Sequence, residues 1–368
     1  MRITEEKKFW IAFSYVRGFG AVRIMKLLEY FGSLQDAWKS NIGDLAQAGI
    51  SKKNIENLSD IRKKLNVDQL IESLIKNGID VYFSDEPDYP QRLAEIEQKP
   101  PVLYYRGSII SGDSLSIGIV GTRKVTHYGK HVSTELGRFC ADNRITTISG
   151  LARGVDAIGH SETIKFGGRT IAVLGSGIDV IYPPEHRHLA EMIIENGAIV
   201  SDYPPGTKPD RINFPPRNRI ISGLSQAVVV VEAGERSGAL ITAEYAANQG
   251  RDVFAVPGPI TSPQSLGTNQ LINSGANILT EYKDLLDYLK INSDKMSQTK
   301  RVRLDPSELL VIQNLGAGGM PTDDLYNACG LPMEKFMAIL TLLEIKGIVD
   351  QENGRVNLLI SPEIQGNV

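Results

Sequence analysis

Hydrophobic and polar positions alternate most regularly in the middle of the chain. Short, fully apolar runs, typical of strands covered on both faces, are separated there by stretches with apolar residues at helical spacing. The pattern predicts strands at 116–120, 146–149, 170–174, 199–201, 227–231 and 252–256, and helices at 128–143, 155–166, 188–196 and 239–248. Repeated strand and helix in this order predicts βαβ units and therefore an α/β, Rossmann-like parallel sheet.

The first part of the chain has a purely helical pattern. Apolar residues recur at helical spacing from residue 5 to about residue 78, which predicts a small N-terminal helical domain. Its joint, VRGFGA, places one apolar residue between Gly18 and Gly20 and resembles the helix-hairpin-helix element of helix-hairpin-helix or SAM-like domains. Such a joint can turn free backbone N–H groups toward a phosphate, but tight helix packing explains the two glycines equally well.

The segment from residue 80 to 116 is rich in proline and tyrosine. Pro100 and Pro101 force an extended backbone ahead of residues 102–105, which we expect to form an edge strand. Because this segment has apolar residues to bury, we assign it to the start of the central domain.

The C-terminal part predicts a tethered winged-helix domain. Residues 291–303 are polar and mostly aperiodic, as in a flexible linker. Helices at 306–315, 321–329 and 332–346 and strands at 348–350 and 355–359 follow. The third helix has few basic residues, which favours a protein contact or an accessory role over the reading of duplex DNA. The expected domains are 1–78, 79–290, the linker 291–303, and 304–361.

Composition and charge narrow the possible partners. The 368 residues carry a net charge of only −3, so any site for a polyanion must be local. The two cysteines, Cys140 and Cys329, lie in different predicted domains without metal-ligand spacing, which fits a reducing compartment. The charged N-terminus lacks the apolar core of a signal peptide, so we expect a cytoplasmic protein. Asp156 and His160 lie one helical turn apart but have no third ligand, and we expect neither a metal nor a cofactor.

A local basic site is predicted just before the strand at 227–231. Arg211, Arg217 and Arg219, with Lys208 upstream, bring cations that suit phosphate, and Phe214 offers a face for a base. Two consecutive prolines within the same stretch predict a stiff loop. The alternative is that these arginines form an ordinary solvated face.

Glycine-rich turns follow three of the predicted strands. Gly121, with Thr122 and Arg123, follows the first strand, Ser149, Gly150 and Arg153 follow the next, and Gly175 and Gly177 follow the third. Because the carboxyl ends of parallel strands meet at one edge of the sheet, we expect these turns to converge with the basic loop. The spacing is not Gly-x-Gly-x-x-Gly, so dinucleotide binding is poorly supported.

The motifs GIVGTR, SGLARGVDAIGH, TIAVLGSGIDVIYPPEH, SDYPPG, NFPPRNRIISGLSQAVVVVEA, SGALITA, GRDVFAVPG and LINSGA resemble, in this order, the DNA-processing protein A family (DprA, also called Smf). The resemblance covers about residues 89–276. It implies a bacterial protein that binds single-stranded DNA, forms a homodimer through its Rossmann-like domain, and loads RecA on incoming DNA during natural transformation, without catalysis.

The resemblance also implies the residues of a DNA pocket. They are Gly121, Thr122, Arg123, Ser149, Gly150, Arg211, Phe214, Arg217, Asn218 and Arg219. One position departs from the common family pattern, since Leu151 stands where a second glycine often follows Gly150.

We therefore predict a non-catalytic single-stranded DNA binder that mediates recombination. The alternative is a nucleotide-processing enzyme of the phosphoribohydrolase type, which would use a carboxylate such as Glu232, Glu235 or Glu244, but the PGGxGTxxE motif of those enzymes is missing. A third possibility, a regulator that reads duplex DNA, rests on the winged helix alone.

Overall fold

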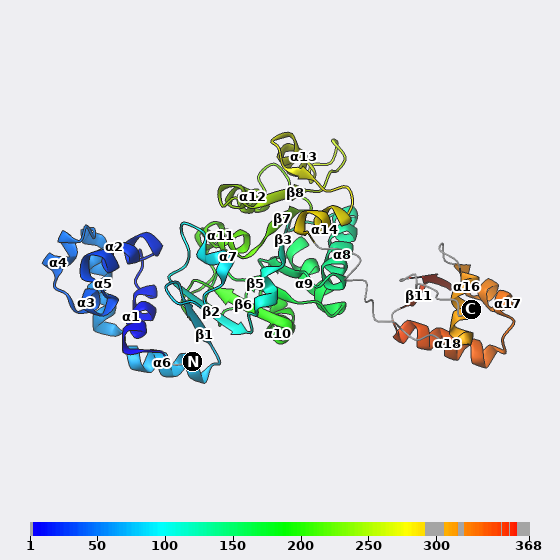
Figure 1. Ribbon diagram of the computed structural model, residues 1–368, viewed down its shortest axis with the longest axis horizontal. Helices are drawn as coiled ribbons and strands as arrows, with labels where there is room; N and C mark the ends of the chain where they lie inside the picture. Colours follow the sequence, from blue (N-terminus) through cyan, green and yellow to red (C-terminus); the bar gives the residue numbers. More distant parts are fainter. Residues whose placement is uncertain (1–2, 291–304, 316–319, 347, 353, 359–368) are drawn as a thin grey trace. The chain divides into compact units, whose positions relative to one another are not determined.

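The computed structural model describes residues 3–290, 305–315, 320–346, 348–352 and 354–358 (Figure 1). The chain divides into two compact units, Met1–Ser293 and Asp294–Val368. The predicted linker at 291–303 lies outside the described residues. The domain boundary expected after residue 78 lies within the first unit and stays a prediction.

The first unit begins with six helices, α1 (Glu5–Ser14), α2 (Ala21–Phe31), α3 (Leu34–Lys39), α4 (Ile42–Gln47), α5 (Lys52–Lys64) and α6 (Val67–Lys76). Local capping explains where several of them begin, because Thr4, Ser33 and Asn66 each accept a backbone N–H of the first turn. Gly32 ends α2 in the left-handed conformation that glycine adopts without strain.

Within residues 3–290, nine strands form one sheet. They are β1 (Asp80–Phe83), β2 (Val102–Gly107), β3 (Ser116–Val120), β4 (Thr146–Ser149), β5 (Thr170–Val173), β6 (Gly197–Ser201), β7 (Ala227–Val230), β8 (Asp252–Ala255) and β9 (Asn277–Ile278). The order is β1-β2-β6-β5-β4-β3-β7-β8-β9, and β3 to β9 run parallel. This confirms the predicted Rossmann-like sheet.

The prediction of an edge strand at 102–105 was wrong. Strand β2 pairs with β1 on one side and with β6 on the other, both antiparallel, so β1 forms the edge. The two prolines lie before β2 rather than within it, so they remove no N–H group from its ladder. Leu103 and Tyr104 are fully buried, as expected for an inner strand.

Helices cover both faces of the sheet. One face carries α8 (His127–Asp142), α9 (Val155–Lys165), α10 (Arg187–Asn196) and α14 (Lys283–Leu289); the other carries α7 (Gln91–Ala94), α11 (Phe214–Leu224), α12 (Gly238–Asn248) and α13 (Leu266–Asn273) (Figure 1). Successive residues of β7 point to opposite faces, so Val228 and Val230 pack in one core and Val229 in the other. Burial on both sides explains why this strand is a continuous apolar run.

The segment predicted as a stiff basic loop is largely helical. A short 3₁₀ turn at Arg211–Asn213 leads directly into α11, and Pro215 and Pro216 occupy its first turn. The first N–H groups of a helix have no partner within the helix, so proline is tolerated there. Arg217 and Arg219 are therefore positioned by a helix, and Arg211 by the 3₁₀ turn before it.

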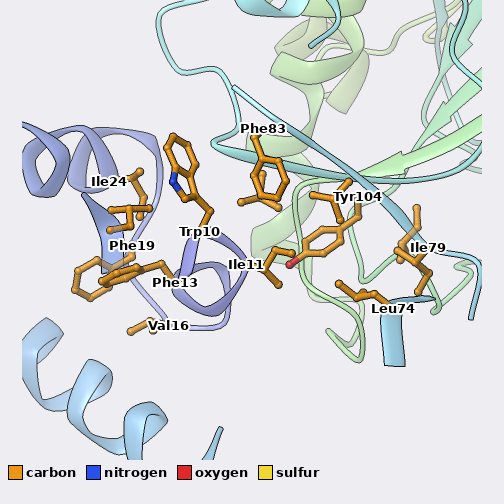
Figure 2. Packing of buried hydrophobic residues seen from close by; sticks show 14 of the residues in the cluster. Trp10, Ile11, Phe13, Val16, Phe19, Ile24, Leu74, Ile79, Phe83 and Tyr104 are labelled. Atoms are coloured by element: carbon orange, nitrogen blue, oxygen red, sulfur yellow. The ribbon is translucent and has the colours of Figure 1, made fainter. Parts of the chain in front are cut away.

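The N-terminal helices pack directly on the β1–β2 end of the sheet. Trp10 of α1 meets Phe83 of β1 edge-on, with 6.2 Å between ring centroids (Figure 2). The Ser14 hydroxyl lies 2.7 Å from the Tyr104 hydroxyl, and the Lys7 ammonium lies 4.3 Å from the Trp10 ring and pairs with Asp85. The helices and this end of the sheet therefore share one hydrophobic core.

The second unit is a winged-helix domain. It contains α16 (Pro306–Leu315), β10 (Met320–Pro321), α17 (Thr322–Cys329), α18 (Met333–Ile345), β11 (Val349–Glu352) and β12 (Arg355–Leu358), with the strand order β10-β12-β11. Its core is built around the buried Phe336, Leu340 and Leu343 of α18. Within the two units, none of the described helices combines the length and the apolar character that a membrane span requires.

Candidate functional site

A pocket of about 710 Å³ lies at the carboxyl edge of the parallel sheet. Its wall is formed by the turn after β3 at 121–124, by Ala152 and Asp156 after β4, by α11, and by the segment that leads into α12. Three of these segments directly follow strands, as expected for a ligand site in an open α/β sheet.

The pocket is strongly basic. Five cationic side chains line it: Arg123, Lys124, Arg211, Arg217 and Arg236. All of them except Arg217 are exposed, and none of those four forms an ion pair with a carboxylate of the described residues. Asp156 is the single carboxylate among the described lining residues. Unpaired guanidinium and ammonium groups around one cavity form a site for a multivalent anion.

Arg217 forms part of the pocket floor. Its side chain is only 3% exposed, and its Nη1 donates hydrogen bonds to the carbonyl of Gly150, at 2.8 Å, and to that of Val173. Burial lowers the pKa of Arg217 to about 10, while the nearby Asp156 carboxylate opposes this shift. The guanidinium therefore stays charged at neutral pH and ties together the ends of β4 and β5.

The turn after β4 is shaped around this buried cation. A Cβ atom at Gly150 would lie 2.7 Å from both terminal nitrogens of Arg217, so any larger residue would displace the guanidinium. Asp156 accepts the backbone N–H groups of Gly150, at 3.1 Å, and Ala152, at 3.3 Å. Burial raises the pKa of Asp156, and Arg217 opposes this shift. Leu151 has a φ of 57°, which explains why a glycine is favoured there.

Phe214 lies between two cations. Its ring centroid is 5.7 Å from the guanidinium carbon of Arg123 and equally far from that of Arg217. The ring of Tyr182 lies beside it, at a centroid distance of 5.7 Å. Gly175 leaves room for this arrangement, since a Cβ atom there would approach the ring to 2.8 Å. An aromatic surface flanked by guanidinium groups suits a ligand that combines a planar ring with a phosphate.

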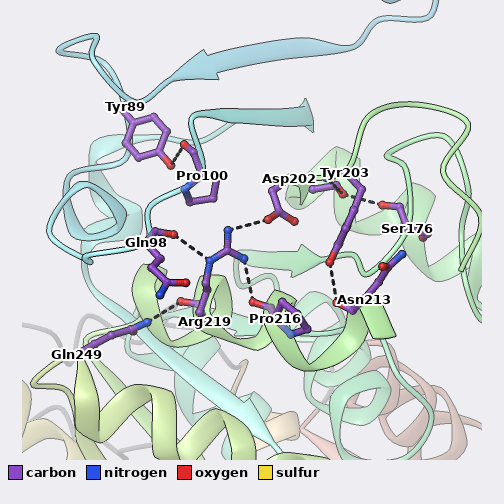
Figure 3. Close-up of polar contacts among 11 residues, drawn as sticks. Tyr89, Gln98, Pro100, Ser176, Asp202, Tyr203, Asn213, Pro216, Arg219 and Gln249 are labelled. Atoms are coloured by element: carbon purple, nitrogen blue, oxygen red, sulfur yellow. Dashed lines mark hydrogen bonds and ion pairs between the residues drawn. The ribbon is translucent and has the colours of Figure 1, made fainter. Parts of the chain in front are cut away.

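Arg219 does not line the pocket. Figure 3 shows its guanidinium enclosed by protein groups: it donates to the carbonyls of Gln98 and Pro216, both at 2.9 Å, and to Asp202 at 2.8 Å. These bonds connect α11 to the segment before β2 and to the end of β6. This position gives no support to the predicted phosphate contact of Arg219.

The remaining predicted residues fall into three groups. Gly121, Thr122 and Asn218 line the pocket; the Thr122 N–H donates to the backbone carbonyl of Glu232 at 2.8 Å, and Asn218 donates to the Gly238 carbonyl at 3.3 Å. Ser149 is buried beneath the turn and donates to the Ile119 carbonyl.

Arg153 and Lys208 are exposed and lie outside the pocket lining. Arg153 forms an ion pair with Glu185, with 2.5 Å between Nη2 and Oε1.

Among the lining residues that sequence reasoning missed are Lys124, Tyr182, Arg236 and Gln264. Lys124 directly follows Arg123, and Arg236 directly precedes Ser237, the N-cap of α12, so proximity to predicted features was an available signal. The segment around Arg236 was instead considered, from sequence, as a source of a catalytic carboxylate. Glu232 is buried and accepts the N–H and the hydroxyl of Thr126, at 3.0 and 2.5 Å.

His160 is a core residue of α9. Its Nδ1 lies 2.6 Å from the Thr170 hydroxyl, and burial lowers its pKa to about 3. No cluster of His, Cys, Asp or Glu suited to a metal ion is found among the described residues. The Asp156–His160 spacing therefore reflects two separate structural roles.

A Rossmann-like sheet with a basic, aromatic pocket at its carboxyl edge defines a class of α/β proteins that bind phosphate-containing ligands. The sequence profile of the DNA recombination-mediator protein A family matches residues 80–290, and that of the DprA winged helix domain matches residues 297–355. The chain belongs to the DNA recombination-mediator protein A family.

Relatives and solved structures agree with this assignment. Protein Smf of Synechocystis is 43% identical over 286 residues, which is 76% of this chain and 72% of the relative. The X-ray structure of DNA processing protein A from Streptococcus pneumoniae superimposes with a TM-score of 0.66 at 34% identity, over 78% of this chain and 98% of that one. A structure describing the single-stranded DNA binding mode of the Helicobacter pylori protein gives 0.51 at 28% identity, over 58% and 94%.

The buried His160 predicts a loss of stability in mild acid. Its pKa is about 3 in the folded chain and 6.5 when unperturbed, so the unfolded chain takes up the proton first as the pH falls. The stabilising contribution is present above pH 6.5 and should decline by about 2 kcal/mol by pH 5. Urea unfolding at pH 7 and pH 5 should therefore show a smaller decline for His160→Asn than for the natural chain. Identical pH dependence of the two would contradict this role.

Proposed function

We propose that this chain binds single-stranded DNA in the pocket at the carboxyl edge of its sheet and acts there as a mediator of recombination on incoming DNA. The observation that carries this proposal is the set of unpaired cations around Phe214. Family membership and the reported single-stranded DNA binding of the Helicobacter pylori relative support it further.

The chemistry of the pocket suits a flexible strand better than a duplex. Arg123, Lys124, Arg211 and Arg236 would contact phosphates, and Phe214 with Tyr182 would stack a base. Stacking needs an unpaired base, and neither kind of contact depends strongly on base identity. A cavity of about 710 Å³ accommodates a few nucleotides at most.

The predicted site residues take different roles in this proposal. Arg217 positions the floor, and Gly121, Thr122, Ser149, Gly150 and Asn218 shape the surrounding turns. Arg153 and Lys208 would contact the strand only where it leaves the pocket. Arg219 would hold α11 in position rather than contact a phosphate.

Arg123→Ala and Arg211→Ala should each weaken binding of a labelled single-stranded oligonucleotide roughly tenfold, since each removes a charge-assisted contact. Each should also lower the slope of log affinity against log salt by about one, because one fewer counterion is released. Fluorescence anisotropy across a salt series measures both quantities.

Lys165→Ala is the matched control, since Lys165 is an exposed cation on α9 that lies outside the pocket. Its affinity and salt slope should equal those of the natural chain. Unchanged binding by both arginine variants would rule the pocket out as the DNA site.

A single small pocket gives weak binding, so we propose that two copies of the chain hold one strand through two pockets. Strand β9 ends the sheet, its Ile278 is exposed, and Ile260 and Leu266 expose further apolar surface between β8 and β9. A second copy placed there would cover this surface and continue the sheet.

Ile278→Asp should convert a dimer to a monomer in analytical ultracentrifugation. It should weaken binding of long oligonucleotides while leaving unchanged the binding of short ones that fill a single pocket. A monomeric natural chain would contradict the proposed pairing. Loading of RecA onto the bound strand, and the cytoplasmic location that this requires, are part of the same proposal and rest on the family resemblance.

We propose no catalytic step. Asp156, the carboxylate in the described pocket lining, already accepts two backbone N–H groups beside Arg217. A phosphoribohydrolase would use such a group to cleave a nucleotide. Incubation of the full chain with nucleoside monophosphates should therefore release no free base by chromatography, and release that Asp156→Asn abolishes would establish the enzyme instead.

A further inference from the structure

The hairpin between α1 and α2 presents an open helix N-terminus. Gly18 has a φ of 95°, and Gly20, the N-cap of α2, is extended and offers no side chain to the first N–H groups of the helix. A Cβ atom at Gly20 would meet nothing within 4 Å. The first backbone N–H groups of α2, an eleven-residue helix, are therefore uncapped and accessible.

Cations, and no carboxylates, occupy the neighbouring first turns. Neither α2 nor α5 has an acidic residue in its first turn, and Arg23 lies in the first turn of α2. Arg23 donates to the Gly18 carbonyl at 2.6 Å, and Arg17 is exposed in the turn itself. A cation at a helix N-terminus opposes the helix dipole, and a bound anion relieves that repulsion.

A buried amide faces the same turn. Asn54 of α5 is 7% exposed, and its Oδ1, Cγ and Nδ2 are the atoms closest to the position that a Cβ at Gly18 would take. Its side chain has no hydrogen-bond partner among the described residues, whereas its neighbour Asn57 donates to the Arg17 carbonyl at 3.0 Å. Because this amide forms no hydrogen bond within the described protein, it is available to donate to a ligand in the hairpin.

We propose that this hairpin is a second nucleic-acid contact that binds a backbone phosphate through the first N–H groups of α2, the Asn54 amide, and the charges of Arg17 and Arg23. The proposal rests on the proposed function, because it assigns the phosphate to the strand held in the pocket. It concerns residues outside the segment matched by the recombination-mediator profile, which begins at residue 80. The contact reads no base, so it extends the footprint on the strand without adding sequence specificity.

Three substitutions at Gly20 separate charge from geometry. Gly20→Ala adds a methyl group in open space and leaves the N–H groups free. Gly20→Asn caps the helix with a neutral oxygen, and Gly20→Asp caps it with a carboxylate that also repels phosphate. Asn and Asp are preferred N-caps, so both variants should fold at least as well as the natural chain, as thermal unfolding will confirm.

In the full-length protein, affinity for a long single-stranded oligonucleotide should be highest and equal for the natural chain and Gly20→Ala. It should be lower for Gly20→Asn and lowest for Gly20→Asp. Gly20→Asp should lose roughly fivefold in affinity and about one unit of salt slope. A short oligonucleotide that fills one pocket should bind all four proteins equally. Equal affinities for the long strand, or an equal loss in Gly20→Ala and Gly20→Asp, would overturn the proposal.

Two further measurements show whether the phosphate is free or part of DNA, and distinguish failure of the hairpin proposal from failure of the proposed DNA-binding function. If inorganic phosphate shifts the backbone amide resonances of residues 18–22 and the oligonucleotide does not, the site binds free phosphate and the strand assignment fails. Arg123→Ala is assayed alongside: if it weakens binding while Gly20→Asp does not, only the hairpin proposal fails. If neither Arg123→Ala nor Arg211→Ala has an effect, the proposed function fails.

Discussion

The buried guanidinium of Arg217 is the interaction on which the pocket depends. It holds the carbonyls of Gly150 and Val173, and so fixes the relative position of two neighbouring strand ends. A buried cation is expensive unless it is paired and fully hydrogen-bonded, and Asp156 supplies the opposite charge. Asp156 in turn binds the backbone of the turn that encloses Arg217. Arg217 and Asp156 therefore both hold the turn at Gly150, one through its carbonyl and the other through its N–H group.

The pocket thus holds two kinds of positive charge. The guanidinium of Arg217 is buried in the floor and held by two backbone carbonyls, although its Nε has no partner. The rim cations Arg123 and Arg211 are exposed and lack ion pairs with the described carboxylates. Phe214 joins the two layers, because its ring lies against both Arg123 and Arg217. A ligand that contacts the Phe214 ring thus meets a preorganised pocket floor and a flexible rim. The conformational entropy lost on binding is therefore mainly that of the rim side chains.

Six parallel strands, β3 to β8, could be predicted to within two residues, because strands such as 116–120 and 227–230 are continuous apolar runs with clear breaks on either side. Strands β1 and β9 were not predicted. Helix α11 was missed, because two prolines in a first helical turn look the same in sequence as two prolines in a loop. That error also hid the difference between Arg217 and Arg219. Residues two apart on a helix point in directions about 200° apart, so one faces the pocket and the other faces Asp202. The position of β2 inside the sheet was not predictable either, since long-range pairing with β6 decides it.

The contact between the N-terminal helices and the sheet has a practical consequence for dissecting this protein. The family profile begins at residue 80, yet Phe83 and Tyr104 on the first two strands are buried beneath α1 and its neighbours. Cutting the chain at that boundary would uncover aromatic surface beside a free strand edge, a combination that promotes aggregation. The segment matched by the family profile is thus smaller than the segment that folds. If the shorter fragment is insoluble, the cause would be the loss of the N-terminal helices that cover its strands, not the absence of a ligand.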